Sequence, residues 1–149
     1  MDKEKLSKYR AEVIERFINV EWLINAIISQ HYFKRVLMPF LLEVLYDEQF
    51  SFSLRRKILK KIVKGIDNKR VEEMYKLNTI RNYFAHCNQE IIMGTDKTQK
   101  GKVIDPRNVE KEVDFESLHS EFMKIVVGVE EYLATLYQGL GGILELEKE

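Results

Sequence analysis

Residues 3–31 read KEKLSKYRAEVIERFINVEWLINAIISQH, and the pattern of this segment indicates a helical fold. Its apolar side chains recur every three or four residues, which is the spacing of one face of an α-helix. Ile14, Ile18 and Trp22 widen that stripe, so we expect one long helix with a central place in the packing. The recurring positions are Leu6, Tyr9, Val13, Phe17, Val20, Ile24 and Ile27.

Three further helices are predicted before residue 88. A short apolar helix at 36–46 contains Pro39, which suits a first turn, and Ser53 is a suitable N-cap for a helix at 54–66. After a break, the helical pattern resumes from about Lys69 to Cys87. The apolar side of the helix at 54–66 consists of Leu54, Ile58, Ile62 and Ile66.

Residues 88–112 interrupt the helical pattern. They form either a small hairpin that pairs Gln89–Met93 with Lys102–Ile104 or an irregular loop. Asp114 is a suitable cap for a last helix. The apolar stripe of that helix consists of Leu118, Phe122, Ile125, Val129, Tyr132 and Leu136.

Together these patterns predict an all-α, up-and-down bundle of four to five helices. We expect a single domain over residues 1–149, with frayed ends at 1–4 and 140–149.

Composition limits the classes of function. The chain carries 24 basic and 24 acidic residues, so a nucleic-acid site would have to come from local clustering. Cys87 is the only cysteine, which excludes an internal disulfide and fits a reducing cytoplasm. The charged N-terminus and the lack of a long apolar run lead us to expect no signal peptide and no membrane helix.

The segment Arg81-Asn82-Tyr83-Phe84-Ala85-His86 carries the most specific chemistry. On a helical wheel Leu77, Ile80 and Phe84 share the apolar side with Glu73 and Cys87. The other side gathers a guanidinium, an imidazole and several amides into one polar patch. That patch consists of Asn78, Arg81, Asn82, Ala85, His86 and Gln89.

This pair of side chains suits RNA cleavage without a metal. Arginine binds phosphate oxygens as a charged fork, and histidine can take or give protons near neutral pH. RNA supplies its own nucleophile, the 2′-hydroxyl. An arginine and a histidine on a polar helix face are, however, more often simply solvated.

The motif resembles the mark of the HEPN superfamily, an Arg, often followed by Asn, with a His four to six residues later, near the N-terminal end of a late helix. Arg81, Asn82 and His86 match it in type, spacing and position, and the helix order over about residues 5–137 looks alike. The resemblance implies a homodimeric, metal-independent endoribonuclease without a cofactor, of the kind found among toxins and defence effectors. It also implies that Arg81 and His86 are catalytic and Asn82 is supportive.

The sequence departs from one branch of this family. That branch pairs with nucleotidyltransferase antitoxins and has a modified Tyr two residues after the His, where this chain has Asn88. The alternative function is a non-catalytic helical module that binds an antitoxin or a nucleotidyltransferase, with the stripe of the last helix as its docking surface.

Other polar residues are weaker candidates. One outer helix face, formed by Arg56, Lys57, Lys60, Lys61 and Lys64, could follow an RNA backbone or could be merely solvated. Glu21 and Asn25 lie in a largely apolar stretch, so we expect either contacts that position Arg81 or His86, or plain surface exposure. His31 and His119 are isolated and predicted to be surface or capping residues, without metal-ligand spacing.

Overall fold

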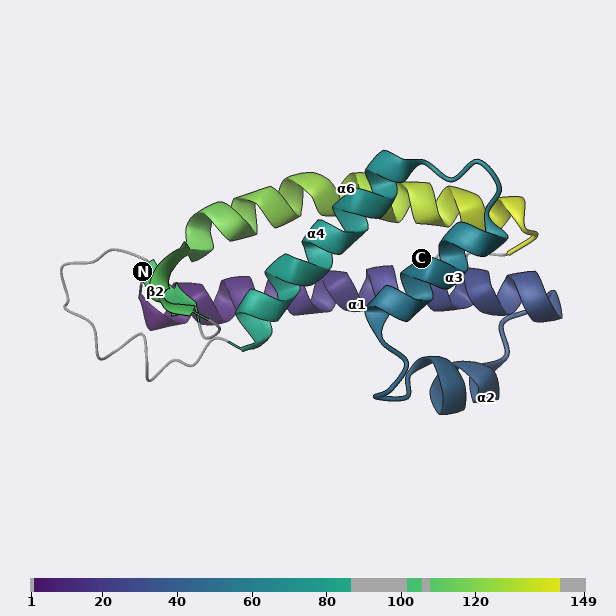
Figure 1. The fold of residues 1–149 in the computed structure, drawn as a ribbon, viewed down its shortest axis with the longest axis horizontal. Helices are drawn as coiled ribbons and strands as arrows, with labels where there is room; N and C mark the ends of the chain where they lie inside the picture. The colour runs from purple at the N-terminus through teal and green to yellow at the C-terminus, as the bar shows by residue number, and fades with distance from the viewer. Residues whose placement is uncertain (1, 87–101, 106–107, 143–149) are drawn as a thin grey trace, which may run out of the picture.

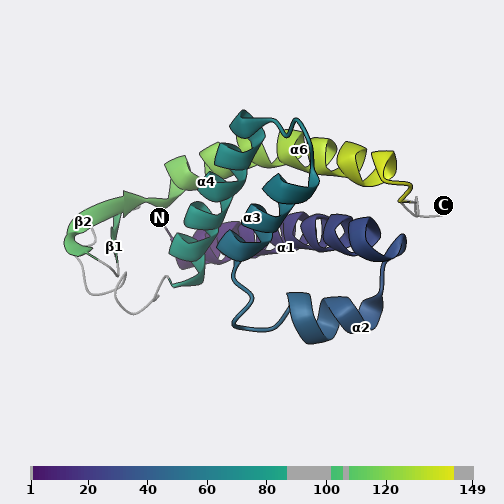
Figure 2. The same cartoon turned by 45° about the vertical axis from the view of Figure 1, so that its right-hand side comes forward.

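The computed structural model describes residues 2–86, 102–105 and 108–142. They form an all-α bundle to which a two-stranded hairpin is attached (Figures 1 and 2). The predicted fold class is therefore confirmed. None of the helices that the structure describes is long and apolar enough to cross a bilayer.

Two long helices form the frame of the bundle. Helix α1 spans Lys3–Phe33 and helix α6 spans Phe115–Gly139, and the two lie side by side in the same direction (Figure 1). An ion pair with two hydrogen bonds, both 2.9 Å long, joins Arg16 of α1 to Glu130 of α6. Near the C-terminal ends of both helices, the Gln30 side chain donates a hydrogen bond to the Leu140 carbonyl.

The shorter elements cover the frame. Helix α3 (Phe52–Ile62) packs against α1, and helix α4 (Asn68–Ala85) crosses both α1 and α6 (Figure 1). A short segment made of α2 (Met38–Phe40) and the π-helical turn η1 (Leu41–Leu45) links α1 to α3.

Short polar side chains cap the N-terminal ends of most of these helices. Asp2, Ser51, Asp67 and Asp114 each accept hydrogen bonds from backbone N–H groups in the first turn of the helix that follows. The predicted cap at Asp114 is confirmed. Helix α3 begins earlier than predicted, because Ser51 and not Ser53 supplies its cap.

The hairpin differs from the predicted one. Strand β1 (Lys102–Asp105) pairs in antiparallel fashion with β2 (Asn108–Asp114), so that Val103 lies opposite Val113. One of the two sequence-based alternatives paired Lys102–Ile104 with Gln89–Met93, and Gln89–Met93 lies outside the described residues. A short connection between neighbouring strands closes a hairpin at lower entropic cost than a long loop does.

The buried residues confirm the apolar stripe predicted for α1, but they differ from the stripes predicted for α3 and α6. All predicted α1 positions except the half-buried Tyr9 are buried, whereas Ile18 and Trp22, predicted to widen the stripe, are exposed. The buried line of α6 is rotated slightly and runs through Phe122, Val126, Val129, Leu133 and Tyr137.

Helix α3 shows the second rotation. Phe52, Arg55 and Leu59 form its buried face, while Leu54 is exposed and Ile58 and Ile62 are half-buried. The prediction placed only apolar residues on this face. An arginine can replace them because its charge is paired inside the bundle, as the contacts below show.

Phe122, a fully buried residue of α6, provides a test of how this helix packs in the core. Replacing the fully buried Phe122 with alanine should lower the free energy of unfolding by about 3–5 kcal/mol, because it leaves a cavity between α6 and α1. Replacing the exposed Val127 on the same helix should change it by less than about 0.5 kcal/mol. Urea denaturation followed by circular dichroism measures both, and equal losses would contradict this packing.

Candidate functional site

The Arg-Asn-His motif lies at the C-terminal end of α4. The resemblance implied a place near the N-terminal end of a helix, so the expected match in position is wrong. Helix α4 ends at Ala85, two residues before the predicted end, so that His86 is the C-cap residue. Leu77, Ile80 and Phe84 are buried as predicted, while the side chain of Cys87 lies outside the described residues. The motif therefore begins within the helix and its histidine follows the last helical turn.

Arg81 does not project freely into solvent. Its guanidinium carbon lies 4.7 Å from the centre of the Phe17 ring on α1, and its side chain is 29% exposed. The Nη2 atom donates a 3.0 Å hydrogen bond to Oδ1 of Asn78, one turn earlier on α4. Arg81 thus faces α1 across the helix interface while it keeps a part of its surface accessible.

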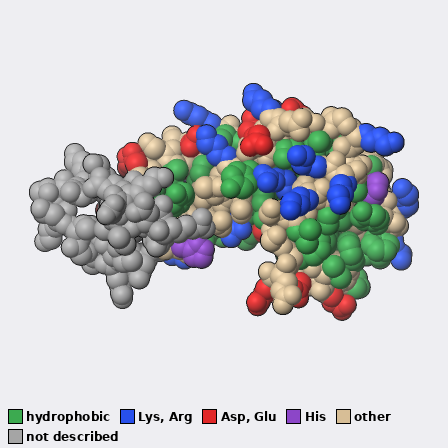
Figure 3. Space-filling view, in the orientation of Figure 1, with side chains coloured by type: hydrophobic (Ala, Val, Ile, Leu, Met, Phe, Trp, Pro, Cys, Tyr) green, Lys and Arg blue, Asp and Glu red, His purple; other side chains and the backbone are tan. Residues whose placement is uncertain are grey.

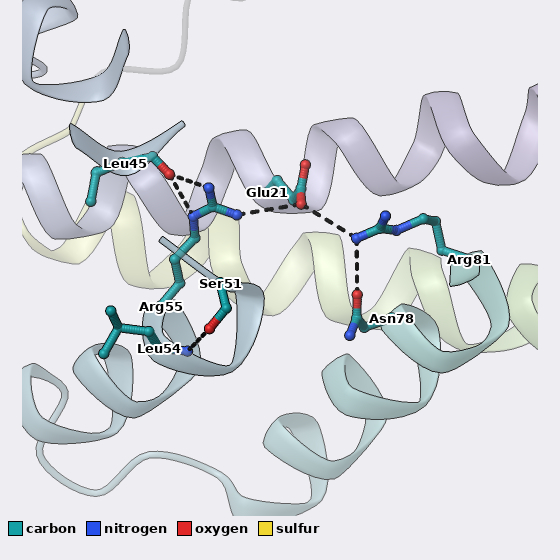
Figure 4. A network of polar contacts seen from close by, with 7 residues as sticks. All are labelled: Glu21, Leu45, Ser51, Leu54, Arg55, Asn78 and Arg81. Atoms are coloured by element: carbon teal, nitrogen blue, oxygen red, sulfur yellow. Dashed lines mark hydrogen bonds and ion pairs between the residues drawn. The ribbon is translucent and has the colours of Figure 1, made fainter. Parts of the chain in front are cut away.

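Glu21 is the acidic partner of Arg81. Its Oε1 atom lies 3.8 Å from Nη2 of Arg81 and 3.4 Å from Nη1 of Arg55 on α3 (Figure 4). One carboxylate on α1 thereby joins α3 and α4. The contact expected between Glu21 and the motif helix is present as an ion pair.

Arg55 is the most deeply placed charge of this network. Its side chain is 7% exposed, and its Nε atom donates a 2.9 Å hydrogen bond to the Leu45 carbonyl at the end of η1. A second donor, Nη2, reaches the same carbonyl oxygen (Figure 4). Arg55 therefore ties the α2–η1 segment to the carboxylate that also holds Arg81.

Burial sets the ionisation of this cluster. It raises the pKa of the Glu21 carboxyl, although the positive charges of Arg55 and Arg81 act in the opposite direction. Burial also lowers the pKa of the Arg55 guanidinium, against the opposing effects of Glu21 and Tyr46. Two cations thus share one carboxylate that is itself partly desolvated.

Asn25 and Tyr46 adjoin the network, and only Asn25 is fully buried. Both polar atoms of the Asn25 side chain and Nε of Arg81 have no hydrogen-bond partner within the part of the chain that the structure describes. Burial raises the pKa of Tyr46, whereas the nearby Asn25 amide lowers it. In the part of the chain that the structure describes, no hydrogen bond joins the Asn25 side chain to Arg81 or His86.

Among the described residues, no hydrogen bond or ion pair joins Arg81 to His86 or Asn82. His86 is exposed, and its imidazole makes no hydrogen bond, ion pair or ring contact with the described residues. Asn82 is half-buried. Arg81 is thus turned towards Phe17 of α1, and His86 is exposed at the end of the helix. The side chain of Gln89 lies outside the described residues.

The predicted basic face is present on α3. Lys57, Lys60, Lys61 and the following Lys64 are exposed, and Arg56 is half-buried. Figure 3 shows lysine and arginine side chains gathered over α3 on the face that is turned towards the viewer. The structure thus brings these cations to the side of the molecule on which α3 and α4 cover the frame (Figure 1).

His119 has a role that the sequence did not reveal. Its Nε2 atom lies 2.6 Å from the Glu12 carboxylate, and its ring stacks on Tyr9 with a centre-to-centre distance of 3.8 Å. It connects α6 to α1 and is not an isolated surface residue. No signal in the sequence joins positions this far apart. Among the described residues, no group of three potential ligands could hold a metal ion.

Comparisons of the chain with protein-family models, with curated proteins and with solved structures found no match. The resemblance to HEPN domains therefore depends on the motif and on the order of the helices.

Replacing Arg55 should destabilise the protein strongly. We expect Arg55→Ala to lower the free energy of unfolding by about 3–5 kcal/mol, because Glu21 and the Leu45 carbonyl both lose a buried partner. Lys57→Ala, an exposed control on the same helix, should cost less than about 0.5 kcal/mol. Chemical denaturation of both variants checks this, and a mild effect of Arg55→Ala would contradict the role of the network.

The raised pKa of Glu21 predicts how the stability of the protein changes with pH. The folded protein binds this proton more tightly than the unfolded chain, whose carboxyl has the ordinary value of 4.5. The contribution of Glu21 to stability should therefore fall as the pH rises from 4.5 through the folded-state pKa.

The Glu21→Gln variant isolates this contribution. Its free energy of unfolding, measured in urea between about pH 4 and pH 7, is subtracted from that of the parent at each pH. The difference, parent minus variant, should decrease with rising pH and then become constant. A difference that increases with pH would mean that the ion pairs, and not burial, dominate the ionisation of Glu21.

Proposed function

We propose that this protein is a metal-independent endoribonuclease of the HEPN type that acts in the cytoplasm as a toxin or defence effector. The observation that supports this most is the placement of Arg81. It is fixed by Glu21, Asn78 and Phe17, yet partly exposed, five residues before an exposed histidine. A fixed guanidinium can bind the scissile phosphate with little loss of conformational freedom.

The proposed reaction needs only groups that the RNA and this motif supply. The 2′-oxygen attacks the adjacent phosphorus, a new P–O2′ bond forms, and the bond from phosphorus to the 5′-oxygen breaks. One imidazole takes the proton of the 2′-hydroxyl or gives a proton to the leaving 5′-oxygen. The products are a 2′,3′-cyclic phosphate, or its hydrolysis product, and a 5′-hydroxyl.

Each motif residue has a distinct role in this proposal. His86 is the general base or acid, and Arg81 binds the phosphate and stabilises its charge in the transition state. Asn82 orients the phosphate or the imidazole. In a homodimer, a second copy of the motif would supply the other proton-transfer group, so that two chains form one composite cleft.

A second candidate function is a non-catalytic module that binds an antitoxin or a nucleotidyltransferase. The predicted docking stripe on the last helix is wrong, because its residues pack against α1 and α4. Exposed apolar side chains occur instead on the α2–η1 segment, where they form a clear patch in Figure 3. The exposed apolar residues of this segment include Met38, Leu42 and Val44.

The enzyme proposal is tested with purified protein and RNA in the presence of EDTA. The parent should cleave RNA, and Arg81→Ala and His86→Ala should each reduce the cleavage rate by about 100-fold or more. The cleaved ends, identified by mass spectrometry, should carry a cyclic phosphate or its hydrolysis product.

Matched controls separate chemistry from folding. Arg35→Ala and His31→Ala remove the same side-chain types at the far end of α1 and should leave the rate unchanged. Circular dichroism must show that all variants are folded. Inactivity of the parent on structured and unstructured RNA at several pH values would rule out the enzyme and favour the binding module.

A further inference from the structure

Tyr75 is an exposed aromatic residue on α4 that the proposed reaction does not use. Tyr75 is 51% exposed, although the large aromatic ring of a tyrosine is usually buried in good part. The guanidinium carbon of Arg56 lies 4.7 Å from the centre of the Tyr75 ring, within the range of a cation–π contact. Two flat groups from different helices, α3 and α4, therefore meet at the surface.

The surroundings of this pair are strongly basic. Lys57, Lys60 and Lys61 are exposed on α3, and this helix contains no acidic residue. The nearest exposed acid on α4 is Glu72, one turn before Tyr75. A cationic surface interrupted by an exposed aromatic ring has the two properties with which proteins bind single-stranded nucleic acid, since cations follow the backbone and rings stack on bases.

On a helical wheel Tyr75 is aligned with Asn82 of α4 and with His86, the residue that caps the C-terminal end of this helix. Asn82 follows Tyr75 by seven residues and His86 by eleven, and both intervals are close to whole numbers of helical turns. The rise of the helix places Tyr75 and His86 about 16 Å apart along its axis. A few nucleotides of extended single strand can span this length.

We propose that Tyr75 and Arg56 form a stacking site for an unpaired base of single-stranded RNA, whose backbone follows the cations of α3. This inference rests on the proposed function and adds the substrate class, because a base within a duplex is already stacked and cannot reach the ring. The base stacks on the Tyr75 ring or on the Arg56 plane, and the strand then runs along α4 towards His86.

Binding is measured with a fluorescent single-stranded RNA whose 2′-hydroxyls are all methylated, so that cleavage cannot occur. Tyr75→Ala should weaken binding by about 5- to 100-fold, the loss that removal of one base-stacking ring produces. Tyr75→Phe keeps the ring and should bind like the parent. Tyr32→Ala, which removes an exposed tyrosine at the end of α1, is the matched control and should also bind like the parent.

Salt dependence separates stacking from charge. Lys60→Gln should reduce the slope of log Kd against log salt by about 0.7, the value for one phosphate contact with a single strand, whereas Tyr75→Ala should leave the slope unchanged. A blunt duplex of the same sequence should bind Tyr75→Ala and the parent equally. Equal single-strand affinity of these two proteins, or no binding of the probe by the parent, would overturn the inference.

The same preparations distinguish this inference from the proposed function. Binding that depends on Tyr75, with no cleavage of the unmethylated RNA, would retain the stacking site and remove the nuclease. Cleavage by the parent, with Tyr75→Ala binding as tightly as the parent, would retain the nuclease and remove the stacking site.

Discussion

The arrangement of this site depends on the ion pairs that the Glu21 carboxylate forms with two arginines. This carboxylate lies on the long helix α1 and meets Arg55 of α3 and Arg81 of α4, so that one acid holds two cations from two other helices. Because all three groups are at least partly buried, removal of one leaves another charge without compensation. The position of Arg81 is thus a property of the bundle and not of the motif helix alone.

The network also links distant parts of the molecule. Arg55 donates to the last carbonyl of η1, and Arg81 packs its guanidinium on Phe17, a core residue of α1. The segment that carries the exposed apolar patch is therefore joined through two ion pairs to the proposed phosphate-binding group. The basic face of α3 and Tyr75 lie outside this network and depend on it only for the packing of their helices.

Sequence periodicity predicted the helices because burial of an apolar stripe is a local pattern. The network was predicted only in part, because Glu21 was expected either to contact the motif helix or to be exposed, whereas Arg55 was not among the residues predicted for the buried side of its helix. The contact between His119 and Glu12 left no signal in the sequence, because it joins two helices at positions separated by most of the chain. The pairing of β1 with β2 was not predicted either, because a local pattern does not specify which segment a strand pairs with.

We propose that Glu21 holds Arg81 where its guanidinium can receive an RNA phosphate. The most direct measurement follows the Nε–H signal of Arg81 by nuclear magnetic resonance, assigned with Arg81→Lys, during titration with methylated single-stranded RNA. We expect a saturable shift of this signal in the parent, and a weaker response in Glu21→Gln. An Arg81 signal that stays unchanged while the RNA saturates the protein would contradict the account.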